Sequence, residues 1–424
     1  MKFYKPYIIA GLIALASYET CAQGRLTLDE AKKMALANNS RLGQADFHIK
    51  AAQAAEAGAK AANKPVIDGS VAALHVGKPL DAFLPSVLAS PTVTVGQPIY
   101  VGGKIRLGQQ AAAKGVEIAQ AQKQLTETEV LFEVEKSYWQ IVSISEKIGL
   151  AGRFGVMLDS LYQDLDDSYQ AGMIFKNDML RVQVQKNENE LNLARATDGL
   201  LMAKMQLAQL MGDPRNTSFA VSDSVTGDFA MLQNDSLLSA VDRRAEIQLI
   251  KRALEAQELN RKLLQADFKP SVSLLAAGFG SFGKNINFES GSNAMASYVG
   301  MLNVSIPIWD WGMKASKVKE QSFKIQAQKA QLQETQDLLS LEIRNAYLKV
   351  NQSAKKIDLS RASVLQAEEN LRLSNDRFEA GTVTGQDVLE AQTLWQQATS
   401  SIIDAKVEYR VNEAALLKAL GELK

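Results

Sequence analysis

The sequence predicts an α+β fold in which very long helices alternate with short pairs of strands. The second half of the chain repeats the first, because residues 98–212 align without a gap on residues 307–421. Residues 99–213 and 308–424 contain no proline, so each tract can be helical over far more than the ~11–12 residues of an average helix. The segments between the helical tracts instead show the two-residue alternation of β-strands.

The repeat is recognised by proline and glycine residues that stay in register at a constant offset of 209 residues. A proline followed by isoleucine and an aromatic residue opens each copy, a glycine lies near its middle, and another glycine closes it. The matched pairs are Pro98 and Pro307, Gly103 and Gly312, Gly172 and Gly381, and Gly212 and Gly421. Because the duplicated unit is this long, the remaining segments are interpreted as parts of two equivalent repeats.

We therefore expect two similar halves after an export signal. The expected segments are a signal peptide (1–22), a first repeat (23–212, with a helix, strands in 65–101 and a long helical hairpin over 104–212), a connector (213–234) and a second repeat (235–424, with a helix, strands in 270–310 and a long helical hairpin over 312–421).

The N-terminus has the pattern of an export signal. Lys2 and Lys5 precede an apolar run over residues 8–16, which is too short to span a bilayer as an anchor. Small residues favour cleavage after Ala22. The alternative is a lipoprotein signal, in which Cys21 would be the acylated residue.

The composition argues against nucleic acid, metal and cofactor. Lys plus Arg equals Asp plus Glu at 47 each among 424 residues, so no excess of positive charge recruits nucleic acid. His48 and His75 lie far apart and Cys21 is the only cysteine, so the spacing of a metal site is absent. Neither a glycine-rich phosphate-binding loop nor a candidate nucleophile is recognisable in the sequence, so the sequence does not indicate an enzyme.

The first helix of each repeat has a recognisable start and end. Thr27 and Glu30 form a capping box, and the helical pattern continues from there to about Ala62. In the second repeat a helix is expected from about residue 235 to about Phe268. A proline follows closely in both cases and ends the helix.

A seven-residue repeat in the second long hairpin predicts a coiled-coil seam, because a strict heptad keeps one face toward a partner helix. Its apolar positions are Ile343, Val350, Ile357, Val364, Leu371 and Phe378, and a small residue follows most of them three places later. In the first repeat the expected seam is looser and runs through Val134, Ile141, Ile148, Gly155, Tyr162 and Tyr169.

Two pairs of strands are expected between the helices, 66–76 with 92–101 and 271–280 with 298–309. In the last strand the more apolar alternate set is Tyr298, Gly300, Leu302, Val304 and Ile306, while Asn303 and Ser305 belong to the other set. Alternating runs of about 9–11 residues are typical of transmembrane barrel strands, although a periplasmic hairpin has the same pattern. Since the smallest barrels have about eight strands, a barrel would need other copies of the chain to close.

Three short motifs carry a resemblance to a known family. Pro-Ile-Trp-Asp-Trp-Gly stands at 307–312, Phe-Glu-Ala-Gly-Thr at 378–382 and Gln-Asp-Val-Leu-Glu-Ala at 386–391. With the duplicated layout, they resemble the TolC-like outer membrane efflux proteins. The resemblance implies an α+β membrane protein: a trimeric 12-stranded outer-membrane β-barrel, with four strands per protomer, continued by a long periplasmic α-helical coiled-coil barrel.

The same resemblance implies a function and a set of partners. It implies an outer membrane channel component of a tripartite efflux or secretion system, acting as a passive exit duct across periplasm and outer membrane. The implied partners are two further copies of the chain (a homotrimer), outer membrane lipid, a periplasmic adaptor protein and an inner-membrane transporter of the RND, ABC or MFS type. The alternative is a trimeric structural or adhesive coiled-coil protein of the cell surface without a transport role.

The resemblance also assigns residues to the periplasmic entrance. Asp387 and Glu390 match acidic positions that line the constriction in some members, and Asp178 matches the equivalent place in the first repeat. Arg181 stands where the first-repeat counterpart of Glu390 would be. The alternative interpretation is that these carboxylates are ordinary solvated helix charges.

The tips of the two long hairpins are expected at glycines. Gly172 and Gly381 fall at the tip turns, and both also suit helix C-caps. Phe378 and Val383 occupy the places where well-known members carry a tyrosine and an arginine that help to hold the tip shut. A closed entrance would therefore depend on packing.

Three aromatic residues lie near expected strand ends. Tyr100, Trp309 and Trp311 are candidates for the membrane–water interface, where aromatic side chains are enriched. The alternative is that they pack in a core.

Overall fold

The computed structural model describes residues 25–79, 83–224, 226–227, 229–232, 236–287 and 289–423, so the predicted signal peptide lies outside the described residues. The chain divides into two compact units, and each unit draws on both repeats. The sheet unit comprises Leu36–Glu133, Phe229–Leu359 and Glu408–Lys424. The hairpin unit comprises the described residues up to Ala35 together with Val134–Asp228 and Ser360–Val407.

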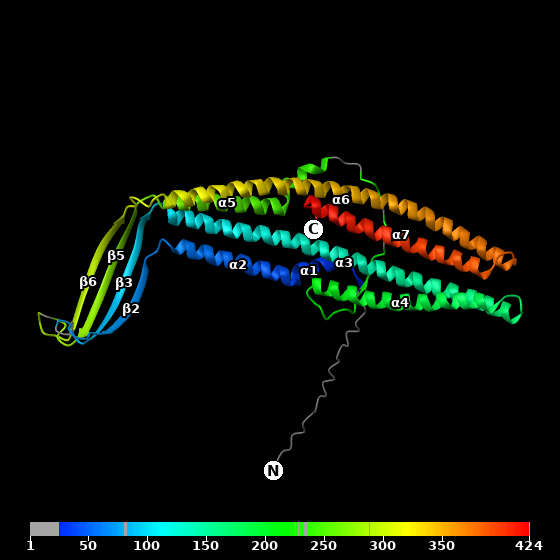
Figure 1. Ribbon diagram of the computed structural model, residues 1–424, viewed down its shortest axis with the longest axis horizontal. Coiled ribbons are helices and arrows are strands. Elements are labelled where there is room, and N and C mark those ends of the chain that lie inside the picture. Colours follow the sequence, from blue (N-terminus) through cyan, green and yellow to red (C-terminus); the bar gives the residue numbers. More distant parts are fainter. Residues whose placement is uncertain are drawn as a thin grey trace, which may run out of the picture. The chain divides into compact units, whose positions relative to one another are not determined.

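The sheet unit contains one four-stranded antiparallel sheet (Figure 1). Its strands are β2 (Val66–His75), β3 (Val87–Val101), β5 (Ser271–Gly283) and β6 (Ala294–Ser305), in the order β2-β3-β5-β6. The two predicted pairings are confirmed, and a third pairing of β3 with β5 joins the two repeats. β3 begins earlier than predicted, and β6 ends at Ser305 rather than near residue 309.

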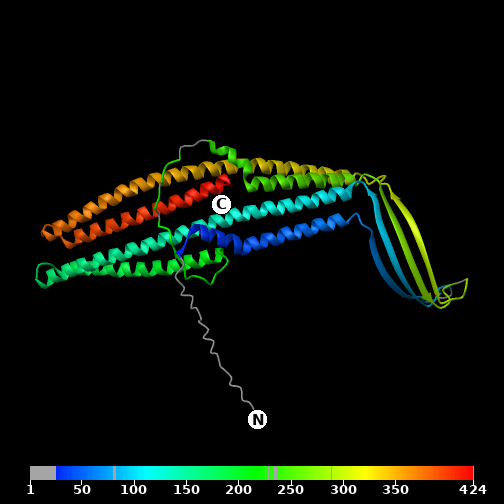
Figure 2. The same cartoon turned by 180° about the vertical axis from the view of Figure 1, so that it is seen from behind.

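Several helical segments accompany the sheet in its unit. They include α2 (Ser40–Ala61), α5 (Ala245–Ala266), the N-terminal parts of α3 (Lys104–Gln170) and α6 (Met313–Glu379), and the C-terminal part of α7 (Gly385–Leu420). Figures 1 and 2 show α2 alongside α3 and α5 alongside α6. No helix among the described residues is both long enough and apolar enough to cross a bilayer.

The predicted first helix is interrupted. The capping box is confirmed, because the Thr27 N–H donates to Glu30 Oε2 at 3.0 Å and the Glu30 N–H donates to Thr27 Oγ1 at 3.2 Å. However, α1 (Leu28–Asn38) stops at Asn39, whose backbone is extended and whose side-chain oxygen accepts from the Arg41 N–H at 2.9 Å. Asparagine is one of the favoured N-cap residues, so the chain starts a new helix, α2, at Ser40.

The first helix of the second repeat also starts later than predicted. Residues Ser236–Arg243 form a 3₁₀ helix, and α5 begins only at Ala245, while the expected cap residues before Ser236 lie outside the described residues. Arg244 occupies the N-cap without a side-chain capping bond. Its buried guanidinium instead pairs with Glu246 and donates to the Lys418 carbonyl at 3.1 Å.

The hairpin unit contains most of α1 and four longer antiparallel helical segments. α4 (Lys176–Leu210) returns along the C-terminal part of α3, and α7 (Gly385–Leu420) returns along α6 (Figures 1 and 2). Its core joins α3, α4 and α7 through Phe154, Leu158, Leu161, Leu165, Met179, Val182 and Val388. These side chains recur at three- and four-residue steps, as expected for long helices packed side by side.

The heptad seam predicted for α6 is confirmed by burial. Ile343, Val350 and Ile357 are fully buried in the sheet unit, and Leu371 and Phe378 are half-buried in the hairpin unit. The seam predicted for the first repeat is only partly correct. Val134 and Ile141 are buried, but Tyr169 is 37% exposed, and the buried positions further along α3 form the shifted series Leu150, Phe154, Leu158, Leu161 and Leu165. An α-helix has 3.6 residues per turn, so a seven-residue series drifts off the packed face where its residues are not consistently apolar.

A tyrosine at the same position of each repeat forms a hydrogen bond with a segment far away in the sequence. In the hairpin unit the Tyr138 hydroxyl lies 2.9 Å from the Leu26 carbonyl and 2.7 Å from Asp223 Oδ2, beside the short parallel pair β1 (Arg25–Leu26) and β4 (Ala220–Val221). Burial raises the pKa of the Tyr138 hydroxyl. In the sheet unit the Tyr347 hydroxyl donates to the Leu232 carbonyl at 2.7 Å.

Candidate functional site

The register of the sheet assigns its side chains to two faces, because residues directly opposite each other in antiparallel strands point to the same side. Val304 is opposite Val272, and Leu302 is opposite Leu274. Following the pairs across the sheet gives one face made up mainly of Ile67, Val71 and Ala73 of β2, Pro91, Val93 and Val95 of β3, Val272, Leu274 and Ala276 of β5, and Tyr298, Gly300, Leu302 and Val304 of β6. The same face also carries the polar side chains of Gln97, opposite Leu274, and of His75, opposite Val87. We call this set the apolar face.

The opposite face of the sheet is mixed. It carries Asp68, Ser70, Thr92, Thr94, Ser273 and Asn303 among smaller and apolar residues. The alternation predicted for one strand therefore extends over all four strands. Large side chains of the apolar face are open to the surroundings, with Val71 74% and Leu302 64% exposed.

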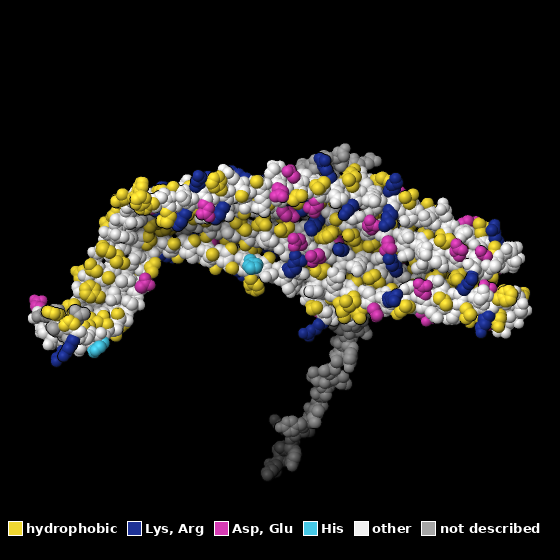
Figure 3. Space-filling view, in the orientation of Figure 1, with side chains coloured by type: hydrophobic (Ala, Val, Ile, Leu, Met, Phe, Trp, Pro, Cys, Tyr) yellow, Lys and Arg dark blue, Asp and Glu magenta, His cyan; other side chains and the backbone are white. Residues whose placement is uncertain are grey.

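The three candidate interface aromatics lie at one end of this sheet. Tyr100 is in β3 opposite Val272, whereas Trp309 and Trp311 follow the end of β6. The two indole rings meet edge to face with centroids 5.7 Å apart, and the two residues are 75% and 89% exposed in the single chain. Figure 3 shows hydrophobic side chains gathered over this junction of the sheet with the start of α6.

Trp311 has a left-handed backbone, with φ +56°. Its counterpart one repeat earlier is Gly102, with φ +66°, which is packed so tightly that a Cβ there would lie 2.7 Å from the Ala266 carbonyl oxygen. The two repeats therefore share a turn that suits glycine. Only the second repeat places a large side chain on it, at a cost in backbone strain.

The tip turns of both long hairpins end in the same hydrogen-bonded motif. Gly172 and Gly381 have φ of +74° and +71°. In the first, the Gly172 N–H donates to the Tyr169 carbonyl at 2.9 Å and the Met173 N–H to the Ser168 carbonyl at 2.9 Å. The bonds at Gly381 have the same pattern, which is a Schellman C-cap. Both glycines thus end a helix and turn the chain.

Asp387 has a local structural role at the start of α7. Its Oδ2 accepts from the Thr384 hydroxyl at 2.7 Å and from the Thr384 backbone N–H at 2.8 Å. These two bonds, the hydroxyl first, hold the pKa of the Asp387 carboxyl below its ordinary value. The side chain is exposed, so the residue is a helix-capping charge that remains open to solvent.

The first repeat lacks this cap. Phe175 stands where Thr384 stands in the second repeat, makes no side-chain capping bond and is 82% exposed. Asp178, the counterpart of Asp387, is half-buried in the first turn of α4. Met173 in the same turn is 72% exposed, so the two tips differ in polarity.

A groove of about 530 Å³ lies between the first turns of α4 and α7 in the hairpin unit, and the sequence did not reveal it. Arg181 lines it from α4 and donates to the Gln386 side chain of α7. Glu390 lines the same groove and is exposed. The structure therefore brings Glu390 together with the arginine that occupies the matching position of the other repeat.

Phe378 belongs to the packing near the tips. Its ring is half-buried and packs against the core cluster of the hairpin unit defined above, and Val383 is half-buried in the turn. A contact that sequence reasoning missed lies beside it. A Cβ placed on Gly385 would come within 2.6 Å of Leu165 Cδ2, so glycine lets the first turn of α7 lie directly on α3.

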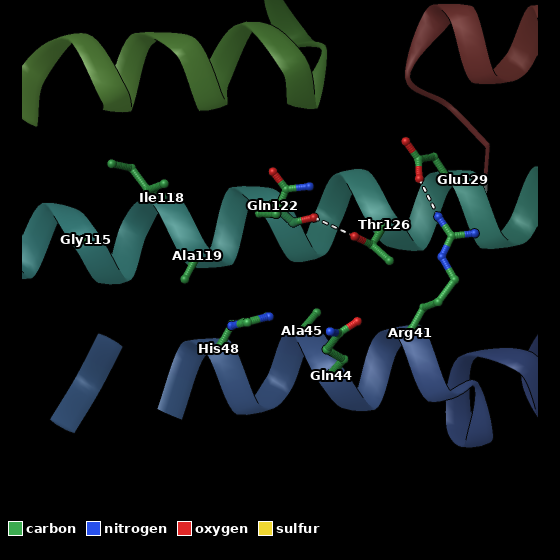
Figure 4. A pocket seen from close by; sticks show the side chains of 10 residues that line it. All are labelled: Arg41, Gln44, Ala45, His48, Gly115, Ile118, Ala119, Gln122, Thr126 and Glu129. Atoms are coloured by element: carbon green, nitrogen blue, oxygen red, sulfur yellow. Dashed lines mark hydrogen bonds and ion pairs between the residues drawn. The ribbon is translucent and has the colours of Figure 1, made fainter. Parts of the chain in front are cut away.

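Figure 4 shows a second groove, of about 460 Å³, between α2 and α3 of the sheet unit. Arg41 at one end contacts Glu129 at 2.7 Å and Glu133 at 3.0 Å, and His48 lines the groove further along. The two terminal nitrogens of the guanidinium donate to these carboxylates and so link α2 to α3. Among the residues that the structure describes, no group of three or more His, Cys, Asp or Glu side chains could hold a metal ion.

Long helical hairpins duplicated in register, together with a four-stranded sheet that has one mainly apolar face, define an α+β fold. The outer membrane efflux protein family matches residues 32–213 and 237–422, and the chain belongs to this family. This membership confirms the predicted family and its place in the outer membrane. It gives no support to the adhesive alternative.

Similar proteins come from several bacteria. The chain is 24% identical to outer membrane protein TolC of Escherichia coli K12 over 281 residues, a stretch that spans 62% of this chain and 56% of that protein. It is 25% identical to the cobalt-zinc-cadmium resistance protein CzcC of Cupriavidus metallidurans, over 88% of this chain and 85% of that protein. The chain thus spans little more than half of the TolC relative.

Two solved structures show the same fold. The Campylobacter jejuni CmeC outer membrane channel superposes with a TM-score of 0.80 at 19% identity, covering 94% of this chain and 86% of CmeC. The open state of the Neisseria gonorrhoeae MtrE outer membrane channel gives a TM-score of 0.79 at 20% identity, covering 94% and 89% of the two chains.

Proposed function

We propose that three copies of this chain form a passive exit duct of a tripartite efflux or secretion system. The four strands of each copy contribute to a twelve-stranded barrel in the outer membrane, and the helices continue it into the periplasm. The observation that carries the proposal is the apolar face, which extends across all four strands with Gln97 and His75 as its polar members and is exposed in the single chain. Lipid covers such a face in a transmembrane barrel, and the mixed face then lines the interior.

The aromatic residues at the end of the sheet support this placement. Tyr100, Trp309 and Trp311 lie next to the apolar face and are exposed, Tyr100 to about half, which suits side chains at the level of lipid headgroups. Their exposure in a single chain would otherwise leave a large apolar patch in water.

The periplasmic end of the duct is formed by the hairpin tips. A periplasmic adaptor protein and an inner-membrane transporter of the RND, ABC or MFS type deliver cargo there. Asp178 and Asp387 lie in the first turns of α4 and α7, and Glu390 lies about one turn further along α7; threefold symmetry would bring three copies of each carboxylate around one opening. Arg181 lies in the same groove as Glu390 and offsets part of that negative charge.

The proposed duct can be tested by its oligomeric state and its ion conductance. Detergent-extracted protein should be trimeric by light scattering corrected for bound detergent, and the same fraction should conduct ions across a planar lipid bilayer. A clean monomer that conducts would contradict the architecture. A trimer that never conducts would contradict the function.

The entrance is tested on the same preparation. Negative charge in a narrow opening attracts cations, so the channel should prefer cations and be blocked by trivalent cations from the periplasmic side. Replacing Asp387, Asp178 and Glu390 with their amides should weaken this block. An unchanged block in the triple variant would show that these residues are ordinary solvated charges and do not line the opening.

A further inference from the structure

The two long helices that lead to the tips differ in their glycine content. α3 contains five glycines, whereas α6 has the same length of 67 residues and contains none. Three of the five, Gly149, Gly152 and Gly155, recur at three-residue steps in the part of α3 that belongs to the hairpin unit. Because a glycine in a helix interior lowers the helix-forming equilibrium roughly fourfold relative to alanine, α3 is weakened over one short stretch.

Packing does not require two of these glycines. A Cβ placed on Gly149 or Gly152 would meet no atom of another described segment within 4 Å, and both residues are exposed. The opposite face of the same stretch is tightly packed, because Leu150, Phe154 and Leu158 are buried. The core contacts therefore hold α3 along one side only, and the open side has room for the helix to bend.

Gly155 lets a side chain of α4 reach the backbone of α3. A Cβ there would lie 3.1 Å from Asn189 Nδ2. Asn189 is buried, and its Nδ2 donates to the Ala151 carbonyl at 3.0 Å. In an α-helix the same carbonyl accepts from the Gly155 N–H. The Asn189 amide thus remains as a donor when this helical bond opens, so the buried carbonyl is not left unpaired.

The links between α3 and α7 are strong before this stretch and weak after it. Before it, Lys147 Nζ forms an ion pair with Asp404 Oδ1 at 2.6 Å. After it, Gln392 Nε2 lies 3.4 Å from the Met157 carbonyl. Gln392 Oε1 is buried and has no hydrogen-bond partner among the described residues. A buried acceptor without a partner is unfavourable, and an N–H group freed by bending of α3 would give it one.

A polar cavity of about 240 Å³ adjoins the same stretch, between α3, α4 and α7. Leu150, Ala151 and Phe154 line it from α3. Its polar lining residues are Lys147, Gln185, Asn189, Asn192, Gln396 and Ser400. A cavity with this size and lining can hold several water molecules. A close-packed core resists deformation, whereas hydrated space lets one helix move against its neighbours.

We propose that residues 149–157 of α3 are a hinge, about which the tip half of the first long hairpin, α3 with α4, bends to open the entrance. Gly152 lies 20 residues before Gly172, which is roughly 30 Å along the helix at ~1.5 Å per residue. A bend of about 10° at that distance moves the tip by roughly 5 Å. The inference rests on the proposed duct and names the hairpin that moves.

Two alanine substitutions test the hinge, because neither new methyl group displaces a neighbour. The test variant combines Gly149→Ala with Gly152→Ala, which together should favour the helical state by about tenfold or more. The matched control combines Gly108→Ala with Gly115→Ala. These glycines lie on α3 in the sheet unit, and a Cβ at either one also has free space around it. The control therefore adds the same helix propensity away from the proposed hinge.

Hydrogen–deuterium exchange of the native trimer, read by mass spectrometry, measures opening of the hinge directly. After correction for intrinsic rates, residues 149–157 should exchange several-fold faster than the equivalent residues 358–366 of α6. The test variant should slow this exchange by about tenfold, and the control should leave it unchanged. Equal protection of the two segments in the wild type would overturn the hinge, as would equal slowing by the control.

Conductance across a planar bilayer then tests what the hinge does. The test variant should lower the fraction of time for which the channel is open several-fold, whereas the control should match the wild type. An unchanged open fraction in a variant whose exchange has slowed would overturn the assignment of the opening motion to the first hairpin. Wild-type trimer that never conducts would instead contradict the proposed function, and the exchange rates would still decide whether the hinge exists.

Discussion

Single residues at the tips show how two copies of one unit have become different. Thr384 and Asp387 cap α7, whereas Phe175 and Asp178 occupy the same places on α4 without a capping bond. An exposed phenylalanine is a poor N-cap. The first tip has therefore lost local stability that the second tip keeps.

The cap at Asp387 should make the second tip sensitive to acid. Its folded pKa is depressed, so its contribution to stability is present above the unfolded pKa of ~3.9 and is lost as pH falls through the folded pKa. The difference in unfolding temperature between wild type and Asp387→Ala should therefore shrink as pH is lowered from 7 to about 3. Thr384→Val, which removes the hydroxyl donor, is the control and should reduce the same pH dependence. A difference that stays constant with pH would contradict the capping role.

Adding an N-cap residue to α4 should stabilise the first tip. Phe175→Thr gives α4 the cap residue that α7 has, and N-cap substitutions of this kind change stability by about 1 kcal/mol. We expect slower proteolysis of the α3–α4 turn in this variant. Phe175→Ala removes the same ring without adding a cap and should give no such protection. Equal protection in both would show that the ring, and not the missing cap, sets the stability.

At the scale of elements, the sequence predicted what depends on local pattern and missed what depends on distant contacts. Alternation and heptads predicted both strand pairs and the α6 seam. The break at Asn39 was not predicted, because in the sequence an N-cap asparagine within a helical pattern looks the same as any other polar residue on the surface of a helix. The β3–β5 pairing and the groove of Arg181 with Glu390 join residues far apart in the chain. Neither leaves a periodic signal, although the shared offset of Arg181 and Glu390 pointed to equivalent places.

The sheet makes a prediction about facing. Arginine that faces lipid near the middle of a bilayer costs roughly 2–4 kcal/mol. Leu302→Arg or Val304→Arg, on the apolar face, should reduce the amount of trimer in the outer membrane fraction. Asn303→Arg lies between them on the mixed face and is the matched control, so it should assemble better. Equal tolerance of all three would contradict the assignment of the faces.

At the scale of the whole molecule, closure of the duct would depend on helix packing. Phe378 packs against the hairpin core, and neither Phe378 nor Val383 has a side chain that can form a hydrogen bond. Phe378→Ala should leave a cavity and raise resting conductance and antibiotic leakage more than Asp387→Asn does. Phe323→Ala on the same helix removes a ring that is 58% exposed and should leave both unchanged. A leak no larger than that of Phe323→Ala would show that other contacts hold the tips.

The edge-to-face pair of Trp309 and Trp311 gives the protein an optical probe of its own. Of the four tryptophans, Trp139 is buried and Trp395 is half-buried, while this pair is open to the surroundings. Indole emission depends on the polarity around the ring, so the exposed component of the fluorescence arises from the junction between the sheet and α6. A shift of that component toward shorter wavelength would follow insertion into a bilayer without any label.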